Sequence, residues 1–277
     1  MRFIHRFAFR APLPLIAELR DLGMKFEPED EVFHEPDPMI AFRVPEDHPH
    51  WPLIQARMHE WKNSGHMVYT EFTPRELDAA RWLHTTAWDN GYALPFEDFK
   101  FFEVTFDRSH ACLRCGYGKV QNAPFRIKGE PKWGRRAIMS LNQAYDELFV
   151  PPAIWETIFK PFGIASRSVA NRHGKLLQTV VQLVIEEEID LATDLLPIRE
   201  RCPECGQPKY QYPERGPFPA LAQGPSGPIA RTRQTFFDGW HTRHIIISQE
   251  LRRAMMAHKI RGADFTPVES HLDAFEA

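Results

Sequence analysis

The sequence predicts an α+β fold with mixed or largely antiparallel sheets and short helices. Its 277 residues are 43% apolar and 12% aromatic, which is enough to build a substantial core. Short stretches with strand and helix patterns follow one another, and 24 prolines and 15 glycines interrupt them. The four cysteines form two distant pairs of the same form, which points to two similar turns.

The N-terminal part predicts a strand, a helix and a loop. Residues 2–9 are rich in Phe and Ile and indicate a strand. Residues 13–22 indicate a helix that ends at Gly23. Residues 27–42 contain six carboxylates, three prolines and no Lys or Arg, so we expect a solvated acidic loop there.

A capping box gives the clearest local signal. Thr73 can cap a helix that starts at Pro74, and Glu76 completes the box, so we expect a helix from there to about Thr85. Residues 100–106 predict a strand that leads to the first cysteine pair.

The second half predicts two further strands and a capped helix. Residues 176–185 are uncharged and mostly β-branched or amide-bearing, which favours a strand covered on both faces. Near the end we expect a strand at 245–247, an N-cap at Ser248, a helix to about Lys259 and a last strand near 264–268. The pattern suggests two domains, an α/β module over 1–98 and a cysteine-containing α+β domain over 99–277.

Both cysteine pairs have the form Cys-x-x-Cys-Gly. In such a turn the amide groups point at the thiolate sulfurs, and the glycine adopts the backbone conformation that the turn requires. Gly, Lys and Gln then recur at the same offsets after each pair, so we expect two matching hairpins. The matched residues are Cys112, Cys115, Gly116, Lys119 and Gln121 in the first, and Cys202, Cys205, Gly206, Lys209 and Gln211 in the second.

Four thiolates with no cysteine left over predict one tetrahedral zinc site at Cys112, Cys115, Cys202 and Cys205. Such a site is closed to water, so the ion is expected to be structural. The alternative is a redox pair or free thiols, although a redox motif usually occurs once, at the start of a helix. His110 lies two residues before Cys112 and could replace one ligand.

Charge is distributed unevenly. The net charge is −3, but residues 1–98 carry 17 acidic and 10 basic side chains, whereas residues 199–261 carry 5 and 11. Arginines at positions 6 and 10 interrupt any apolar run at the start, and the longest uncharged apolar stretch is about half of what a membrane span needs. We therefore expect a cytoplasmic protein with no membrane partner and with reduced cysteines.

The sequence lacks the common catalytic motifs. It contains no P-loop, Gly-x-Gly-x-x-Gly, His-Glu-x-x-His or Gly-x-Ser-x-Gly pattern. We expect a protein that is not an enzyme and has no small-molecule substrate.

Several segments resemble one bacterial family. The two Cys-x-x-Cys-Gly motifs, Phe237-Asp238, the segment 245–251 and the ending 260–268 are similar to the double-CxxCG-motif proteins. The resemblance covers about residues 199–268 and the first turn, 112–121. It implies a role in immunity to polymorphic toxins that are delivered between neighbouring cells.

Three binding functions follow as expectations. In the first, the protein neutralises a cognate protein toxin by direct binding, and the acidic segment contacts a basic toxin surface through Glu29, Asp30, Glu31, Glu35 and Asp37. In the second, the protein is a zinc-ribbon nucleic-acid binder that uses the basic C-terminal part. In the third, it is a structural subunit of a defence or secretion assembly. The arginines considered for the second are Arg231, Arg233, Arg243, Arg252 and Arg253.

Overall fold

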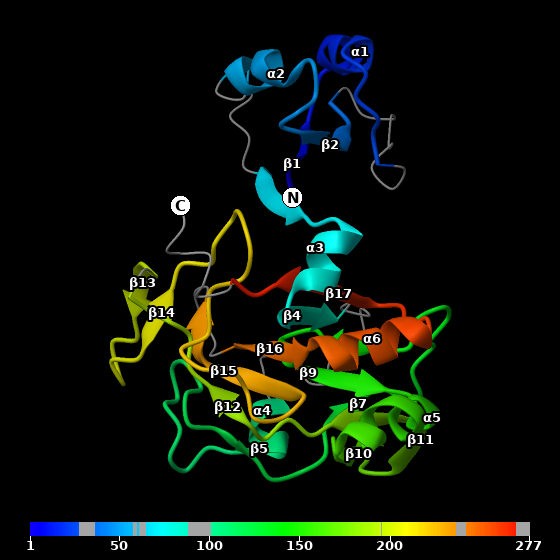
Figure 1. The fold of residues 1–277 in the computed structure, drawn as a ribbon, viewed down its shortest axis with the longest axis vertical. Helices are drawn as coiled ribbons and strands as arrows, with labels where there is room; N and C mark the ends of the chain where they lie inside the picture. Colours follow the sequence, from blue (N-terminus) through cyan, green and yellow to red (C-terminus); the bar gives the residue numbers. More distant parts are fainter. Residues whose placement is uncertain are drawn as a thin grey trace. The chain divides into compact units, whose positions relative to one another are not determined.

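The computed structural model describes residues 1–27, 37–57, 60, 65–87, 101–194, 196–236 and 242–269. Over these residues the protein is a mixed α+β structure, built mostly from strands with a few short helices (Figure 1). The predicted fold class is confirmed at this level. No helix in the described ranges is both long and apolar enough to cross a lipid bilayer.

Contacts divide the chain into two compact units. The first unit is Met1–Glu76 with Pro213–Pro217, and the second is Leu77–Tyr212 with Phe218–Ala277. This division differs from the boundary predicted near residue 98, because strand β4 (Trp82–Ala87) hydrogen-bonds to strands of the second unit.

The first unit is a three-stranded antiparallel sheet with two helices. Its central strand β1 (Arg2–Arg10) pairs with β2 (Met39–Pro45) on one side and with β3 (Met67–Glu71) on the other. Helices α1 (Leu13–Asp21) and α2 (Trp51–Arg57) contribute to one apolar core with this sheet. Buried members of that core include Phe7, Ile16, Leu19, Ile40, Phe42, Trp51 and Ile54.

Sequence patterns predicted much of this unit. The strand at 2–9 and the helix at 13–22 are confirmed. The loop predicted over 27–42 is wrong at its C-terminal end, which is part of β2. The side chains of Ile40 and Phe42 are fully buried at alternate positions of that strand, so burial of one strand face outweighs the loop signal of the preceding carboxylates and prolines.

The segment Pro213–Pro217 is part of the first unit although it is distant in sequence. The Arg215 guanidinium donates to the Glu46 carboxylate at 2.5 and 3.2 Å and lies 4.9 Å from the centre of the Phe3 ring. The amide of Gly216 donates to Thr70 Oγ1 at 2.9 Å. These contacts hold the segment against β1 and β3.

The predicted capping box is confirmed, but the helix after it is shorter than expected. The Thr73 amide donates to Glu76 Oε2 at 2.8 Å, and the Glu76 amide donates to Thr73 Oγ1 at 3.3 Å. Helix α3 spans only Pro74–Ala79, and the residues predicted to continue it to Thr85 form β4. Because β4 lies between β16 and β17 in a sheet, its pairing overrides the local helical pattern.

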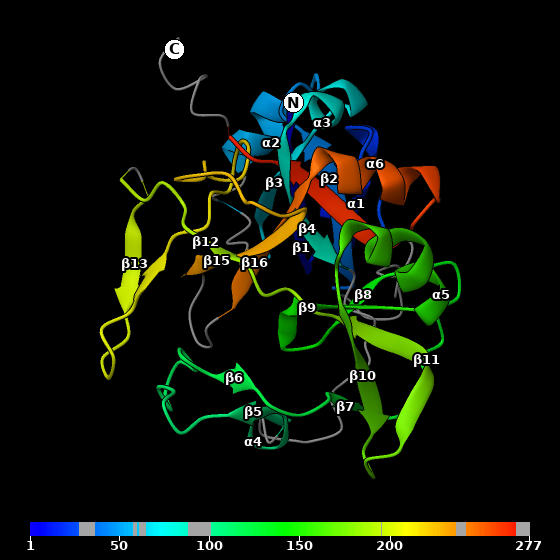
Figure 2. The ribbon, with the colours of Figure 1, turned by 60° about the horizontal axis from the view of Figure 1, so that its bottom comes forward.

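The second unit contains three sheets (Figures 1 and 2). The seven-stranded sheet has the order β13-β14-β15-β16-β4-β17, with β12 paired to β15, and the five-stranded sheet has the order β7-β10-β11-β9-β8. Strands β5 and β6 form a separate pair. The bounds are β5 Phe106–Asp107, β6 Val120–Gln121, β7 Arg126–Ile127, β8 Met139–Leu141, β9 Ala144–Val150, β10 Ser166–Asn171, β11 Leu176–Leu183, β12 Glu188–Ile189, β13 Ile198–Arg201, β14 Pro208–Tyr210, β15 Ile229–Phe236, β16 Arg243–Ser248 and β17 Ala263–Pro267.

Short helices accompany these sheets. α4 covers Phe101–Thr105, and α5 (Pro152–Ile154) continues into a π-helical turn at Trp155–Phe159 and a 3-10 turn at Lys160–Phe162. α6 (Gln249–Ala257) follows β16 directly and is drawn in orange beside it in Figure 1. Its residue Leu251 lies in the same core cluster as residues of β4, β9 and β16.

The C-terminal prediction is confirmed in detail, whereas the strand predicted at 100–106 is wrong. Ser248 caps α6, because its Oγ accepts from the Leu251 amide at 3.2 Å. Residues 101–106 instead hold α4 and the first residue of β5. Phe102 of α4 and Phe106 of β5 both pack into one core cluster, so burial of these two rings accompanies the change from helix to strand.

Candidate metal centre

Each cysteine pair lies in the loop of a short antiparallel hairpin. Cys112 and Cys115 lie between β5 and β6, and Cys202 and Cys205 lie between β13 and β14. Figure 2 shows the first hairpin at the base of the view in green, and strand β13 of the second at the left. The sequence prediction of two matching hairpins is therefore confirmed.

The backbone of the first turn is closed by two hydrogen bonds. The Cys112 amide donates to the Tyr117 carbonyl at 2.8 Å, and the Gly116 amide donates to the Cys112 carbonyl at 2.8 Å. Gly116 has φ +75°, in the left-handed region where a Cβ atom is strained.

The second turn repeats this pattern residue by residue. The Cys202 amide donates to the Gln207 carbonyl at 2.9 Å, the Gly206 amide donates to the Cys202 carbonyl at 2.8 Å, and Gly206 has φ +72°. The two turns therefore have the same local geometry, as the shared Cys-x-x-Cys-Gly motif predicts.

The fold brings the four sulfur atoms together. The Sγ atoms of Cys112 and Cys202 are 3.7 Å apart, and those of Cys115 and Cys205 are 3.5 Å apart. All four Sγ atoms lie within 4.8 Å of one another, and among the described residues this is the one group of metal-ligating side chains so close together. None of the four cysteines is in a disulfide.

This arrangement can hold a metal ion. Four sulfurs about 2.3 Å from a central zinc ion, at the corners of a tetrahedron, lie about 3.8 Å from one another. The 3.5 and 3.7 Å separations are close to that value, and they exceed the disulfide bond length of about 2.05 Å. A donor set of four thiolates suits zinc or an iron–sulfur centre, and it leaves no open position on a tetrahedral ion.

The electrostatic surroundings of the four thiols differ. Backbone N–H groups of Cys205 and then Glu204 lower the pKa of Cys202 to about 6. Burial raises the pKa of Cys115 to about 12, and partial desolvation of its thiolate also raises the pKa of Cys205. Four thiolate anions at this spacing repel one another, so a bound cation is needed for all of them to be ionised together.

The centre lies at the edge of the protein core. Cys115 and Cys202 are buried, Cys205 is exposed, and Cys112 is intermediate. His110, which the sequence offered as a substitute ligand, is exposed and is not a member of the four-residue group.

Most of the residues expected to contact a partner lie outside the residues that the structure describes. Of the five carboxylates, only Asp37 lies in the described residues, where it is exposed and its carbonyl oxygen accepts from Arg10 at 3.2 Å. The other four, Glu29, Asp30, Glu31 and Glu35, lie outside the described residues.

Four of the five arginines considered for nucleic-acid binding are paired with carboxylates. These pairs reduce the positive charge that phosphate groups would meet. Arg253, the fifth of these arginines, is exposed. The pairs are Arg231 with Glu147, Arg233 with Asp190, Arg243 with Glu188 and Arg252 with Asp78.

Sequence reasoning missed a buried polar network beside the first hairpin. Gln121 and Gln182 exchange two side-chain hydrogen bonds, and Gln182 also donates to Glu147. The recurrence of Gln after each cysteine pair was the available signal. It marked Gln121 as part of a repeated unit but did not indicate its partners.

Comparison with protein-family models, curated proteins and solved structures finds no significant match. The resemblance to the double-CxxCG-motif proteins therefore stays a prediction that rests on the sequence motifs.

Proposed function

We propose that this chain is a non-enzymatic binding protein whose second unit is fastened by one structural zinc ion, and that it acts as an immunity protein against a cognate protein toxin. The observation that carries the zinc proposal is the grouping of four Sγ atoms within 4.8 Å. The toxin proposal is supported by the family resemblance and by the acidic N-terminal part of the sequence.

Zinc is the ion that fits the centre best. The two turns are of the knuckle type that supplies paired thiolates in zinc ribbons, and a closed four-sulfur shell suits a structural ion. Such an ion joins two hairpins whose cysteine pairs are separated by 86 residues. Joining distant chain segments in this way restricts the unfolded chain and makes folding depend on the metal.

Charge supports a basic protein partner. Many carboxylates in the described part of the first unit are already ion-paired within that unit, including Glu27 with Arg6 and Arg43, Glu46 with Arg215, and Asp47 with Arg2. The five expected contacts belong to the acidic excess of residues 1–98. An excess of this kind favours rapid association with a basic surface.

The experiment has two separate parts. Elemental analysis of freshly purified protein should find about one zinc per chain, and an absence of metal contradicts the metal centre. Co-expression with the toxin encoded by the neighbouring gene should rescue growth, and the two proteins should elute together. If growth is not rescued and no complex forms, the immunity role is wrong whatever the metal content.

Charge reversal then tests the expected contact residues. Replacing Glu29, Asp30 and Glu31 by Lys should slow association with the toxin and reduce its dependence on salt. A matched control is the replacement of the exposed carboxylates Glu156, Glu186 and Asp194 of the second unit by Lys, which should leave association unchanged. Equal effects of both triple variants would contradict the assigned surface.

A further inference from the structure

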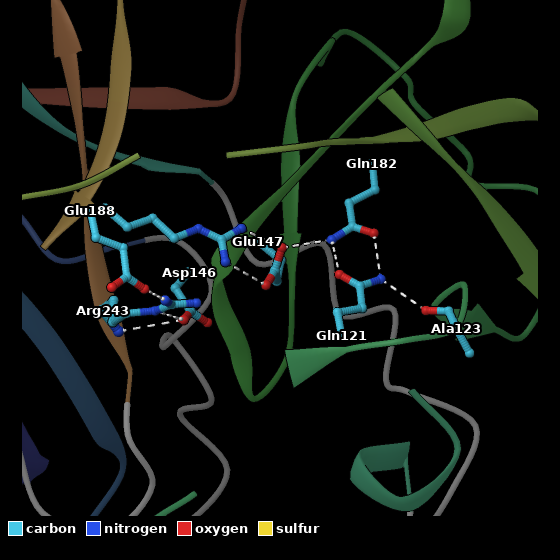
Figure 3. A network of polar contacts seen from close by, with 8 residues as sticks. Gln121, Ala123, Asp146, Glu147, Gln182, Glu188 and Arg243 are labelled. Atoms are coloured by element: carbon cyan, nitrogen blue, oxygen red, sulfur yellow. Dashed lines mark hydrogen bonds and ion pairs between the residues drawn. The ribbon is translucent and has the colours of Figure 1, made fainter. Parts of the chain in front are cut away.

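A chain of hydrogen-bonded polar side chains crosses the three sheets described for the second unit (Figure 3). Gln121 of β6 and Gln182 of β11 exchange amide hydrogen bonds of 2.8 and 2.9 Å. Gln182 Nε2 also donates to Glu147 of β9 at 2.7 Å. Arg231 of β15 donates to both oxygens of Glu147, at 2.7 and 3.0 Å. We call Gln121, Gln182, Glu147 and Arg231 the polar chain.

Three of the four members of the polar chain are almost completely shielded from water, and Gln121 is half-buried. Gln182 is 1% exposed, Glu147 is 3% exposed and Arg231 is 7% exposed. Buried groups of this kind are costly to place unless their hydrogen bonds are made, and apolar side chains of similar size often give equal stability. What the polar chain adds is a fixed geometry, because each of its hydrogen bonds requires a narrow range of distances and angles.

The two ends of the polar chain are connected to the two cysteine hairpins through strands. Gln121 is six positions after Cys115 in the strand that leaves the first turn. At the other end, Arg231 lies on β15, which further along pairs in parallel with β14, the strand that leaves the second turn, through Thr235 and Phe236. The metal centre and the polar chain therefore close a ring that runs through both hairpins.

Charged neighbours reinforce the centre of this ring. Arg243 of β16 donates to Glu188 at 2.6 Å, and its Nε lies 3.5 Å from Asp146, the neighbour of Glu147 on β9 (Figure 3). Burial by itself would raise the pKa of Asp146, but the nearby cations Lys119, Arg231 and Arg243 lower it to about 2. Lys119 is the residue that both cysteine turns share at this offset.

We propose that the polar chain positions the metal centre, holding the two cysteine turns at the spacing that four-sulfur coordination needs. Gln121, Gln182 and Glu147 are thus positioning residues for a metal that they do not touch. This inference rests on the proposed zinc centre and extends it to residues outside the cysteine turns.

The test compares metal affinity in full-length variants. Gln121→Leu removes the link between the first hairpin and the rest of the polar chain, and zinc affinity should fall by roughly tenfold, the lower end of the range seen for groups that orient metal ligands. Affinity is measured by competition with a chromophoric chelator. Cobalt(II) is then added at saturation, and the absorption bands of tetrahedral cobalt should shift or broaden in the variant.

Glu130→Gln is the matched control. The Glu130 carboxylate accepts from the backbone amides of Gln178 and Thr179, so it also links a loop to β11, and these two partners lie outside both cysteine hairpins. Its substitution should leave zinc affinity and the cobalt spectrum unchanged. If Gln121→Leu does not fold, Gln121→Asn keeps the amide, shortens the side chain by one methylene group and replaces it in the same assay.

The outcomes are distinct. Zinc affinity that falls in the Gln121 variant but not in the control supports positioning. Unchanged affinity and spectrum, even with a less stable metal-free protein, overturn it and leave the polar chain a purely structural feature. A wild-type protein that binds no zinc overturns the proposed centre itself, before any variant is compared.

Discussion

The Sγ atoms of Cys115 and Cys205 lie 3.5 Å apart although the two residues are 90 positions apart in the sequence. They are the second cysteines of two turns with the same hydrogen bonds and the same left-handed glycine. Their proximity is the strongest indication that the two hairpins form one centre.

Loss of one thiolate should release the metal. Cys115 is the most buried of the four ligands, at 1% exposure, so Cys115→Ser should weaken zinc binding by more than about 100-fold, the upper end of the effect of groups that only orient ligands. His110→Ala is the control, because His110 is outside the sulfur group. Metal content after dialysis checks both variants, and retention of zinc by Cys115→Ser would contradict the assigned ligand set.

The glycine of the second turn should resist substitution. Gly206 has φ +72°, so Gly206→Ala is expected to destabilise the protein by about 1–2 kcal/mol through backbone strain. Gly129 has nothing within 4 Å of the position of an added Cβ atom and has no left-handed φ. Gly129→Ala should therefore be neutral or slightly stabilising in urea unfolding. Equal effects at the two sites would mean that the turn is not strained by a side chain.

Acid should destabilise the second unit through a buried histidine pair. His84 Nε2 and His244 Nδ1 are 2.9 Å apart, and both side chains are buried. Burial lowers the pKa of His84 well below its usual value and lowers the pKa of His244 to about 4. As the pH falls below about 6.5, these two histidines take up protons in the unfolded chain while they stay neutral in the folded protein. Each of them then lowers the free energy of unfolding by about 1.4 kcal/mol for every further pH unit.

Urea unfolding between pH 7.5 and 4.5 checks this pH dependence. The contribution is fully present above pH 6.5 and is lost as the pH falls toward the folded-state pKa values. A His84→Asn/His244→Asn variant should show a shallower slope than the wild-type protein in the same buffers. The exposed His173→Asn is the control and should retain the wild-type slope. Identical slopes in all three proteins would rule out the histidine pair as the cause.

Removing one member of the buried ion pair between Arg231 and Glu147 should lower the free energy of unfolding strongly, whereas replacing both members by apolar residues should lower it less. Arg231→Met leaves Glu147 buried without its bidentate partner and should destabilise the protein by about 3–5 kcal/mol. The double variant Arg231→Met/Glu147→Leu should recover much of that loss. Arg233→Met removes an exposed pair with Asp190 and should cost less than about 1 kcal/mol. A double-mutant cycle in urea measures these differences, and additive effects of the two core substitutions would contradict the coupling.

Local signals predicted the parts of the fold that local geometry controls. The Cys-x-x-Cys-Gly turns, the capping box at Thr73 and the Ser248 cap each depend on residues within a few positions of one another. The sequence predicts these turns and caps because the residues that interact in each of them are close together in the chain.

Non-local contacts explain what the sequence did not predict. The local pattern predicts a continued helix where β4 forms, because the partners of β4, β16 and β17, lie more than 150 positions away. The partner of Arg231 is Glu147, 84 positions earlier, and no periodicity connects the two. The contacts expected at Glu29, Asp30, Glu31 and Glu35 lie outside the described residues and stay predictions.

The ion pair between Arg215 and Glu46 determines which fragments of this protein can contain the complete first unit. A fragment that stops after Glu76 would retain every strand of the first sheet. It would still lack the Arg215 guanidinium that pairs with Glu46 and the Gly216 amide that donates to Thr70 Oγ1. An N-terminal fragment would therefore be an incomplete version of its own unit. Supplying a peptide that contains residues 213–217 in trans, or grafting that segment onto the truncated chain, is the way to restore it.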